Sequence, residues 1–212
     1  ALITAGTLCF FIGLRVYPGT RSDIAHSKPK QTTEAYIADS AKAQERKADP
    51  SDRANLKRVL SKYAADHEIE LSLVLALMKV ESGFDPRATS PAGARGLMQL
   101  MPDTARLMGL TVHGAIDERL DPAKNIGAGI RYLKHLMDMF DNPVDAVAAY
   151  NVGPTIVKRG LPSNTETLQH VYKVMRQKHL YEKSSALMNY DMDLMLRKCK
   201  RARLTRNSME VH

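Results

Sequence analysis

Glu81 is the carboxylate of this chain whose position best suits chemistry. It follows a nearly all-apolar segment, LSLVLALMKV, and precedes a loop rich in glycine and proline. Such a segment is typical of a core helix, so Glu81 is expected where a buried helix meets a cleft. Burial destabilises an ionised carboxylate, and Glu81 should therefore keep its proton to higher pH than a surface glutamate. A protonated carboxylic acid can donate to the leaving oxygen of a glycosidic bond, so the position favours general acid catalysis.

Structural roles and a two-carboxylate mechanism are alternatives for this residue. Glu81 can cap its own helix or pair with Arg87 or Arg95 in the loop that follows. A second carboxylate facing it across a cleft, Asp85 or Asp103, would make hydrolysis plausible. However, Asp85 precedes a proline and is expected to turn outward, while Asp103 is better explained as a first-turn helix residue. A lone acid is therefore the favoured arrangement.

Helices must hold the loop that follows Glu81. Helices are expected to begin near Asp52, Leu71, Pro102, Pro122, Pro143 and Glu166. Proline is favoured in the first turn of a helix, and Ser163 and Glu166 are spaced as a capping box. The loop covers about residues 83–96, and we find no strand pattern of useful length and no internal repeat. The predicted fold class is all-α.

Four motifs follow one another in an order that is similar to one known family. They are ESGFDPRATSPAGARGLMQLMPDTA from Glu81, DPAKNIGAGIRYL from Asp121, YNVGP from Tyr150 and ETLQHV from Glu166. Together they resemble the catalytic signature of the soluble lytic transglycosylase (SLT) domain, over about residues 52–175. The resemblance implies a goose-type-lysozyme-like helical fold and cleavage of peptidoglycan.

The resemblance also implies a mechanism with Glu81 as the only catalytic carboxylate. Glu81 would protonate the oxygen between N-acetylmuramic acid and N-acetylglucosamine, while an oxocarbenium-like charge develops on the sugar. The ionised Glu81 would then take the proton of the C6 hydroxyl of the same muramoyl unit, closing a 1,6-anhydro ring. An intramolecular attack of this kind has a high effective concentration and needs no positioned water. No metal or cofactor is implied.

Other residues stand where the family places its cleft residues. They are Ser90, Gln99, Met101, Tyr150 and Asn151. Ser90 and Gln99 offer hydroxyl and amide groups suited to sugar hydroxyls and N-acetyl groups. Tyr150 would orient Glu81 or contact the muramoyl unit, and Met101 would form an apolar wall. Asn151 has the alternative role of fixing the turn at the end of its helix through backbone bonds.

His170 departs from the family pattern, which usually has a tyrosine before the valine of the last motif. If that tyrosine contacts the catalytic glutamate, a histidine would change both the hydrogen bond and the pH profile. The sequence alone favours another interpretation, in which His170 is a partly exposed helix residue. His170 is nevertheless retained among the substrate-binding candidates.

The charge distribution indicates which partners the chain suits. The formal net charge is +8, yet residues 51–175 carry 15 basic and 14 acidic side chains, against 9 and 4 in residues 176–212. A near-neutral central region argues against a nucleic-acid-binding face there. The two cysteines form no CxxC motif, and no HExxH motif is present, so no metal site is predicted.

The two ends of the chain indicate where the protein is located and how the chain is divided into segments. Residues 1–17 begin with an uncharged apolar run and are expected to be a signal peptide or membrane anchor, which predicts a periplasmic location. Residues 18–50 are predicted to be a polar linker, residues 51–178 the catalytic domain and residues 179–212 a basic helical tail. The tail has three alternatives: a membrane or cell-wall contact, docking onto a secretion or division complex, or packing back onto the domain.

The sequence leaves three functions open, and the partner in each of them is a peptidoglycan glycan strand. The leading one is a lytic transglycosylase. The nearest alternative is a hydrolysing muramidase, which would leave a reducing muramic acid end. A non-catalytic wall-binding module with the same fold is the third.

Overall fold

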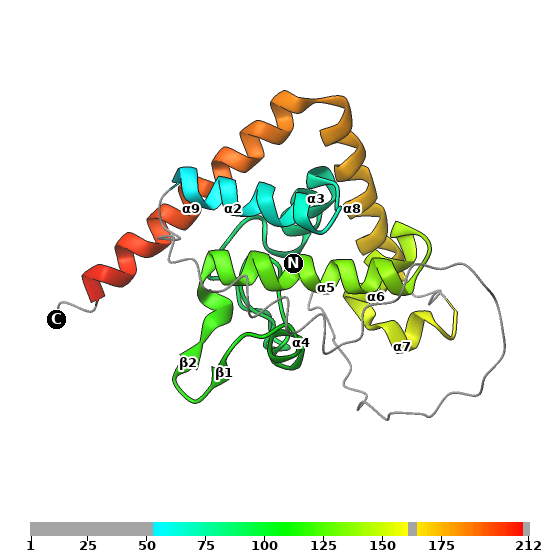
Figure 1. The fold of residues 1–212 in the computed structure, drawn as a ribbon, viewed down its shortest axis with the longest axis horizontal. Helices are drawn as coiled ribbons and strands as arrows, with labels where there is room; N and C mark the ends of the chain where they lie inside the picture. Colours follow the sequence, from blue (N-terminus) through cyan, green and yellow to red (C-terminus); the bar gives the residue numbers. More distant parts are fainter. Residues whose placement is uncertain (1–52, 161–164, 210–212) are drawn as a thin grey trace, which may run out of the picture.

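The computed structural model describes residues 53–160 and 165–209 and is predominantly helical (Figure 1). The longer helices are α2 (Arg53–Asp66), α3 (Leu71–Ser82), α5 (Pro122–Met139), α6 (Pro143–Val152), α8 (Thr165–Lys183) and α9 (Ser185–Met209). The shorter elements are α4 (Pro102–Leu107), α7 (Pro154–Val157), the 3-10 helix η2 (Glu118–Leu120) and the strands β1 (Val112–His113) and β2 (Ile116–Asp117). The helical class expected from the sequence is confirmed for this part of the chain.

Capping side chains explain where the middle helices begin. The Asp121 side chain accepts a hydrogen bond from the Lys124 backbone N–H at 3.0 Å, and proline follows at the first position of α5. Asn142 caps α6 in the same way, through the Asp145 N–H at 2.8 Å. These caps satisfy N–H groups that have no partner within the helix. Ser163, the first residue of the expected capping box, lies outside the described residues.

Helix α3 is the most deeply buried element. Each residue from Leu73 to Met78 is at most 2 % exposed, so the rest of the protein covers nearly every face of this helix. It packs along α8, which in turn packs on α6, while α5 contacts α2 on one side and α4 and η2 on the other (Figure 1). A helix that is hydrophobic all round belongs in a core. The end of α3 is therefore rigidly placed.

The strands β1 and β2 are a difference from the prediction. They pair antiparallel as a hairpin, with Val112 opposite Asp117 and His113 opposite Ile116. Each strand has two residues, which is too short for an alternating pattern to be recognised in the sequence. The hairpin brings Asp117 and η2 against the loop that follows α3, which covers residues 83–101 in the structure and not only 83–96 as expected.

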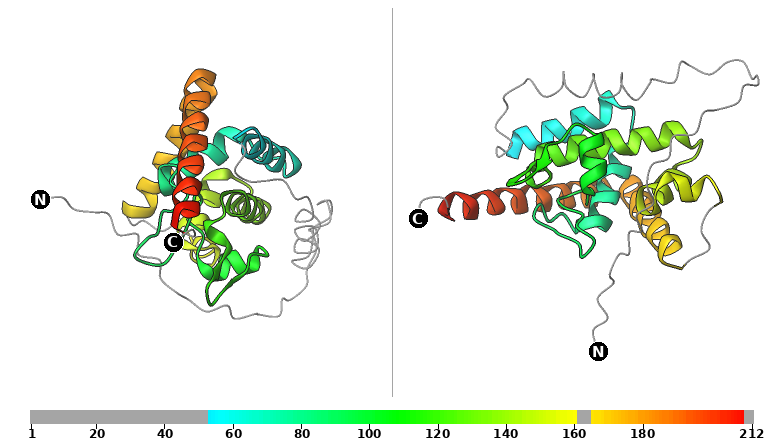
Figure 2. Two further views of the ribbon diagram at one scale, coloured as in Figure 1. Left: turned by 90° about the vertical axis from the view of Figure 1, so that its left-hand side faces the viewer. Right: turned by 90° about the horizontal axis from the view of Figure 1, so that it is seen from below.

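Helix α9 packs back onto the helical core and extends along its outside (Figure 2). Its buried apolar side chains are Met192, Met195, Leu196 and Cys199. The packed-back alternative for the tail is therefore confirmed, and this part of its apolar face is not available to a membrane. The boundary expected between residues 178 and 179 stays a prediction about chain organisation.

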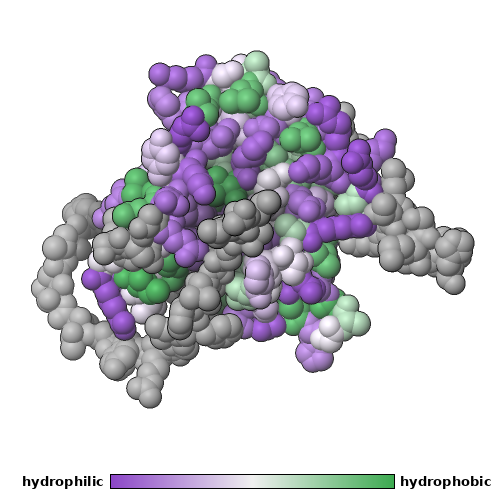
Figure 3. Space-filling model, turned by 180° about the vertical axis from the view of Figure 1, so that it is seen from behind, coloured by the Kyte–Doolittle hydropathy of each residue, from purple (hydrophilic) through white to green (hydrophobic). Residues whose placement is uncertain are grey.

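None of the described helices is long and apolar enough to cross a membrane. The expected signal or anchor at 1–17 and the linker at 18–50 lie outside the described residues. Seen from behind, the described surface is mainly hydrophilic with separate hydrophobic patches (Figure 3).

Candidate active site

Glu81 lies in the last turn of α3, and its side chain is 15 % exposed. Its Oε1 atom lies 3.0 Å from Nε2 of His170. The structural pairings considered from the sequence are wrong, because Arg95 binds Asp117 and Arg87 donates to the Ala202 carbonyl. A half-buried carboxylate with an imidazole partner is therefore the centre of the site.

His170 is a partner of Glu81, and it is also the partly exposed helix residue that the sequence favoured. It comes from α8, its side chain is 12 % exposed, and its Nδ1 atom has no hydrogen-bond partner among the described residues. The packing of α8 along α3 brings together two residues that are 89 positions apart. The only signal of this contact in the sequence was the histidine itself, which stands where the family usually has a tyrosine.

The end of α3 is held by Ser82 and Gly83. The Ser82 hydroxyl bonds to the Leu97 carbonyl at 2.7 Å, which joins the helix end to the loop. Gly83 adopts a φ of 58°, a left-handed conformation in which glycine has no steric penalty. Phe84 follows with a φ of 66° and is fully buried. These residues fix the direction in which the chain leaves Glu81.

Asn125 of α5 holds the far side of the loop. Its side-chain Oδ1 accepts the Met98 N–H at 2.8 Å, and its Nδ2 donates to the carbonyls of Arg95 and Arg119 at 3.0 and 2.9 Å. Asn125 is fully buried, so all three bonds are shielded from water. The family motif containing Asn125 thus acts on the loop and not on substrate.

Two glycines allow this close approach. A Cβ atom at Gly96 would lie 2.4 Å from both the Arg119 carbonyl and Asn125 Nδ2, and the residue has a φ of 82°. A Cβ atom at Gly129 would lie 2.3 Å from the sulfur of Met98. Neither position can accept a side chain without displacing its neighbours.

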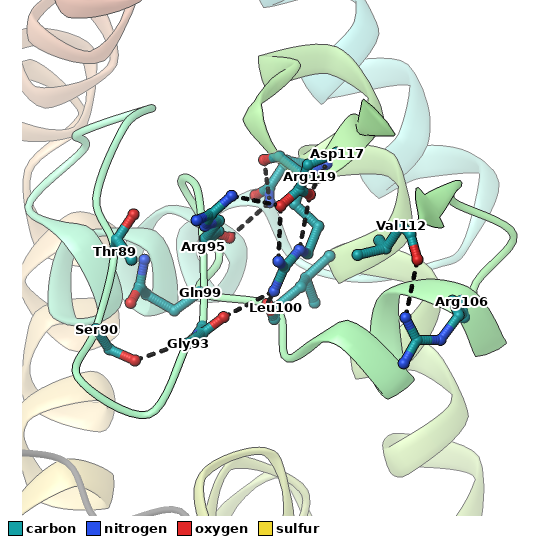
Figure 4. Close-up of polar contacts among 12 residues, drawn as sticks. Thr89, Ser90, Gly93, Arg95, Gln99, Leu100, Arg106, Val112, Asp117 and Arg119 are labelled. Carbon is teal, nitrogen blue, oxygen red and sulfur yellow. Dashed lines mark hydrogen bonds and ion pairs between the residues drawn. The ribbon is translucent and has the colours of Figure 1, made fainter. Parts of the chain in front are cut away.

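A buried arginine, Arg119, organises the loop through charge (Figure 4). Its guanidinium makes two bonds to the Asp117 carboxylate, at 2.8 and 2.7 Å, and also donates to the Gly93 and Leu100 carbonyls. The hydrogen bond from Arg119 holds the pKa of Asp117 below its usual range. The pair with Asp117 is a bidentate contact of the strong kind. The bonds to Gly93 and Leu100 were not predicted, because they join residues that are 26 and 19 positions apart in the sequence.

The structure places Ser90 and Gln99 on the same loop (Figure 4). The Ser90 hydroxyl oxygen accepts the Ala94 N–H at 3.0 Å. The Gln99 Nε2 donates to the Ala88 and Gly96 carbonyls, and the residue has a φ of 46°. Both side chains therefore stabilise the loop, and contact with a sugar stays a prediction for each.

Tyr150 also binds the loop rather than Glu81 directly. Its hydroxyl donates to the Met98 carbonyl at 2.9 Å, and its ring packs against Tyr132 at 5.2 Å between centroids. Burial, together with the negative charge of Glu81, raises the pKa of the Tyr150 phenol well above its ordinary value. The phenol therefore remains a neutral donor next to the site.

The two other predicted residues, Asn151 and Met101, are half-buried. The Asn151 amide makes no hydrogen bond to any described residue, so it does not fix the turn in the way considered from the sequence. That turn is closed by the backbone, through the Gly153 N–H and the Ala149 carbonyl at 2.8 Å. Met101 precedes α4 as its N-cap residue.

The competing carboxylates have other partners. Asp85 is exposed and accepts the backbone N–H of Arg87 at 2.9 Å. Asp103 is also exposed, lies in the first turn of α4 and pairs with Arg106 at 2.5 Å. The structure therefore shows no second carboxylate bound into the site around Glu81 in the described part of the chain.

Neither a metal cluster nor the hollow between α3 and α8 marks another site in the described part of the chain. No group of three histidine, cysteine or acidic side chains that could hold a metal ion occurs within 53–160 and 165–209. A hollow of about 520 Å³ between α3 and α8 contains neither Glu81 nor His170. Its lining residues are Lys79, Val80, Tyr172, Lys173, Arg176 and Gln177. The candidate site is therefore the one around Glu81, where the carboxylate and imidazole meet.

Comparison with known families decides which group this arrangement belongs to. The family profile described as the transglycosylase SLT domain matches residues 58–173. The chain belongs to this family. The matched SLT residues include Glu81, the loop that follows it, Tyr150 and His170, whereas α9 lies beyond them.

Known proteins with similar SLT sequences carry murein transglycosylase names. The chain is 33 % identical over 118 residues to the soluble lytic murein transglycosylase of Escherichia coli K12, covering 53 % of this chain and 18 % of that protein. It is 34 % identical over 145 residues to the membrane-bound lytic murein transglycosylase F of Citrobacter koseri, covering 61 % of this chain and 27 % of that protein. The chain thus matches under a third of either relative.

Solved structures agree on the SLT fold. The crystal structure of the 70 kDa soluble lytic transglycosylase of E. coli superposes with a TM-score of 0.55 at 29 % identity, over 60 % of this chain and 24 % of that one. The lytic transglycosylase Slt of Pseudomonas aeruginosa, solved as an inactive mutant with glutamate replaced by glutamine, gives 0.53 at 29 % identity, over 71 % and 28 %. The helical, lysozyme-like architecture expected from the resemblance is confirmed.

Proposed function

We propose that this protein is a peptidoglycan lytic transglycosylase that cleaves the β-1,4 bond between N-acetylmuramic acid and N-acetylglucosamine. The observation that carries the proposal is Glu81, half-buried at the end of α3 within a matched SLT domain. The named activities of the relatives in E. coli and Citrobacter koseri support it. A 70 kDa soluble lytic transglycosylase that this chain resembles has also been solved in complex with bulgecin A.

Glu81 acts first as the acid in the proposed reaction. Its proton passes to the glycosidic oxygen, the bond from that oxygen to C1 of the muramoyl unit breaks, and positive charge develops on that sugar ring. The N-acetylglucosamine side leaves with a new hydroxyl. Glu81 is then a carboxylate beside the electron-deficient C1 atom, where its charge stabilises the developing oxocarbenium-like species.

Glu81 acts next as the base. It takes the proton of the C6 hydroxyl of the same muramoyl unit while that oxygen bonds to C1, so a 1,6-anhydro ring closes and no water is consumed. Glu81 is protonated again at the end of the cycle. The outward positions of Asp85 and Asp103 support one carboxylate in both roles.

Several neighbours of Glu81 would each bind part of the substrate. Asn151 offers an amide with no described partner, and Gln99 offers the Oε1 atom that its own loop bonds leave unused. Ser90, Met101 and Tyr150 would complete the sugar contacts. His170 would orient Glu81 through the 3.0 Å contact between its Nε2 atom and Oε1 of the carboxyl group.

Product analysis on purified cell-wall sacculi tests the proposed activity. The parent protein should release muropeptides with 1,6-anhydromuramic acid ends, detected by mass spectrometry. Glu81→Gln should reduce their release by about a thousandfold or more, since it removes both the acid and the base. Asp85→Asn is the matched control and should retain parental activity, because that carboxylate is exposed and bound to its own loop.

Other outcomes of this experiment would contradict the proposal. Muropeptides with reducing muramic acid ends would identify a hydrolysing muramidase. Binding of both parent and Glu81→Gln to sacculi without any cleavage would indicate a wall-binding module. Full activity of Glu81→Gln would exclude Glu81 as the acid.

We also propose a periplasmic location, since murein is the substrate named for the relatives. One of these relatives is described as membrane-bound, and the apolar run within residues 1–17 supports export or anchoring here. Arg197, Lys200 and Arg201 remain exposed on α9, so attraction to an anionic surface or a secretion or division complex stays a proposal for the tail. Fractionation of cells that express the full chain tests the location.

A further inference from the structure

Helix α9 lies outside the matched SLT residues, yet it binds the chain on both sides of Glu81. On the near side, Asp191 of α9 accepts a hydrogen bond from Lys79 at 3.0 Å, two residues before Glu81. On the far side, Lys198 of α9 donates to the Gly83 carbonyl at 2.8 Å, two residues after Glu81. The end of the catalytic helix is thus held from one neighbouring helix at two points.

Asp191 also joins α9 to the helix that carries His170. The Tyr181 hydroxyl of α8 donates to the second oxygen of Asp191 at 2.6 Å. The Asp191 side chain is only 4 % exposed, so its carboxylate has exchanged water for these two donors. One buried carboxylate therefore connects α3, which carries Glu81, with α8, which carries His170 about three turns before Tyr181.

The residues that follow Glu81 are also held together and connected to α9. The Gly83 N–H bonds to the Lys79 carbonyl and closes α3, while the Lys79 ammonium lies 5.2 Å from the centre of the Phe84 ring. Arg87, further along the loop, donates to the Ala202 carbonyl of α9. Displacement of α9 would therefore release the helix end, the left-handed turn and the loop together.

We propose that α9 is a positioning element of the active site, with Asp191 and Lys198 as its positioning residues. They hold Glu81 at its 3.0 Å spacing from His170 and fix the direction of the loop that follows. This inference rests on the proposed transglycosylase function. It makes residues beyond the SLT match part of the catalytic unit.

The distinguishing property of such residues is a larger effect on kcat than on substrate affinity. Neither residue is among those proposed to touch sugar. A small displacement of Glu81 slows a reaction that depends on orientation, and shifts near 1 Å can lower rates by about a hundredfold. KM should change less than kcat, because Ser90 and Gln99 are also held by bonds within their own loop and Tyr150 and Asn151 lie on α6.

The test measures kcat and KM on soluble glycan strands with the full chain, at a temperature where circular dichroism shows each variant folded. Lys198→Met should lower kcat about tenfold or more with a smaller change in KM. Lys198→Arg, which keeps a donor for the Gly83 carbonyl, should restore most of the rate. Lys200→Met, an exposed neighbour on the same helix, is the matched control and should equal the parent.

Asp191→Asn tests the other contact and should show the same kcat loss. Its control is Asp138→Asn, which breaks an exposed pair with Lys134 by the same chemical change. If Asp191→Asn does not fold, the comparison of Lys198→Met with Lys198→Arg and Lys200→Met decides alone. Parental kcat in Lys198→Met would overturn the proposal, and a parent without anhydro products would instead overturn the proposed function.

Discussion

At the scale of single residues, the pair of Glu81 and His170 determines the chemistry. Oε1 of Glu81 lies 3.0 Å from Nε2 of His170, so the ring fixes the orientation of the carboxyl group. The proposed reaction requires Glu81 to reach both the glycosidic oxygen and the C6 hydroxyl. The rate of such a reaction depends on orientation, so the contact with His170 bears directly on it.

His170→Phe should therefore lower the rate of the enzyme. The substitution keeps an aromatic ring but removes the ring nitrogen that contacts Glu81, so we expect kcat to fall about tenfold or more. Initial rates of anhydromuropeptide formation measure this loss, and an unchanged kcat would show that His170 does not position Glu81.

Substitutions of two asparagines should distinguish an effect on stability from an effect on substrate binding. Asn125→Ala removes three buried hydrogen bonds and should lower the free energy of unfolding by about 2–3 kcal/mol. Asn151→Ala removes no described bond and should change it by less than about 0.5 kcal/mol, while raising KM for glycan strands. Urea unfolding and steady-state kinetics measure the two effects, and a large loss of stability in Asn151→Ala would contradict its assignment to substrate.

At the scale of elements, the loop after α3 is shaped by its neighbours more than by its own residues. The helix α5 supplies Asn125, the hairpin supplies Asp117, and η2 supplies Arg119. Ser82 and Tyr150 add bonds from the ends of α3 and α6. A loop held from so many sides can present Glu81 and its neighbours in one arrangement.

Gly96 and Gly93 provide a paired test of this close packing. Both have positive φ angles, 82° and 86°, but a Cβ atom meets neighbours at 2.4 Å only at Gly96. Gly96→Ala should lower the free energy of unfolding by about 2–5 kcal/mol, from strain and overlap together. Gly93→Ala should lower it by about 1–2 kcal/mol, from backbone strain alone. Equal losses in thermal or urea unfolding would contradict the steric explanation.

At the scale of the whole molecule, α9 makes the core larger than the SLT match. Its buried residues join the same hydrophobic cluster as α2, α3 and α8. Burial raises the pKa of the Cys199 thiol to about 12, with a smaller contribution from the charges of Asp85 and Asp121. The thiolate that reacts with labelling reagents is therefore scarce in the folded protein.

Cys199 can report whether α9 stays docked. In a Cys9→Ser background, labelling by a thiol reagent at pH 8 should be at least about a hundredfold slower in the native protein than in urea. Lys198→Met should speed native labelling if α9 loosens from the core, whereas Lys200→Met should not. Rapid labelling of the native parent would contradict the docking of α9.

The helical class, the order of the core helices and Glu81 as the candidate acid could all be predicted from the sequence. These conclusions depend on local signals: apolar spacing, first-turn prolines and motifs that are contiguous in the chain. The partner of Glu81 was not determined, because His170 reaches it only when α8 packs along α3. The hydrogen bonds from Arg119 to the loop and the docking of α9 depend likewise on contacts between distant segments. Such contacts follow from how buried faces fit together, and only the tertiary structure decides that fit.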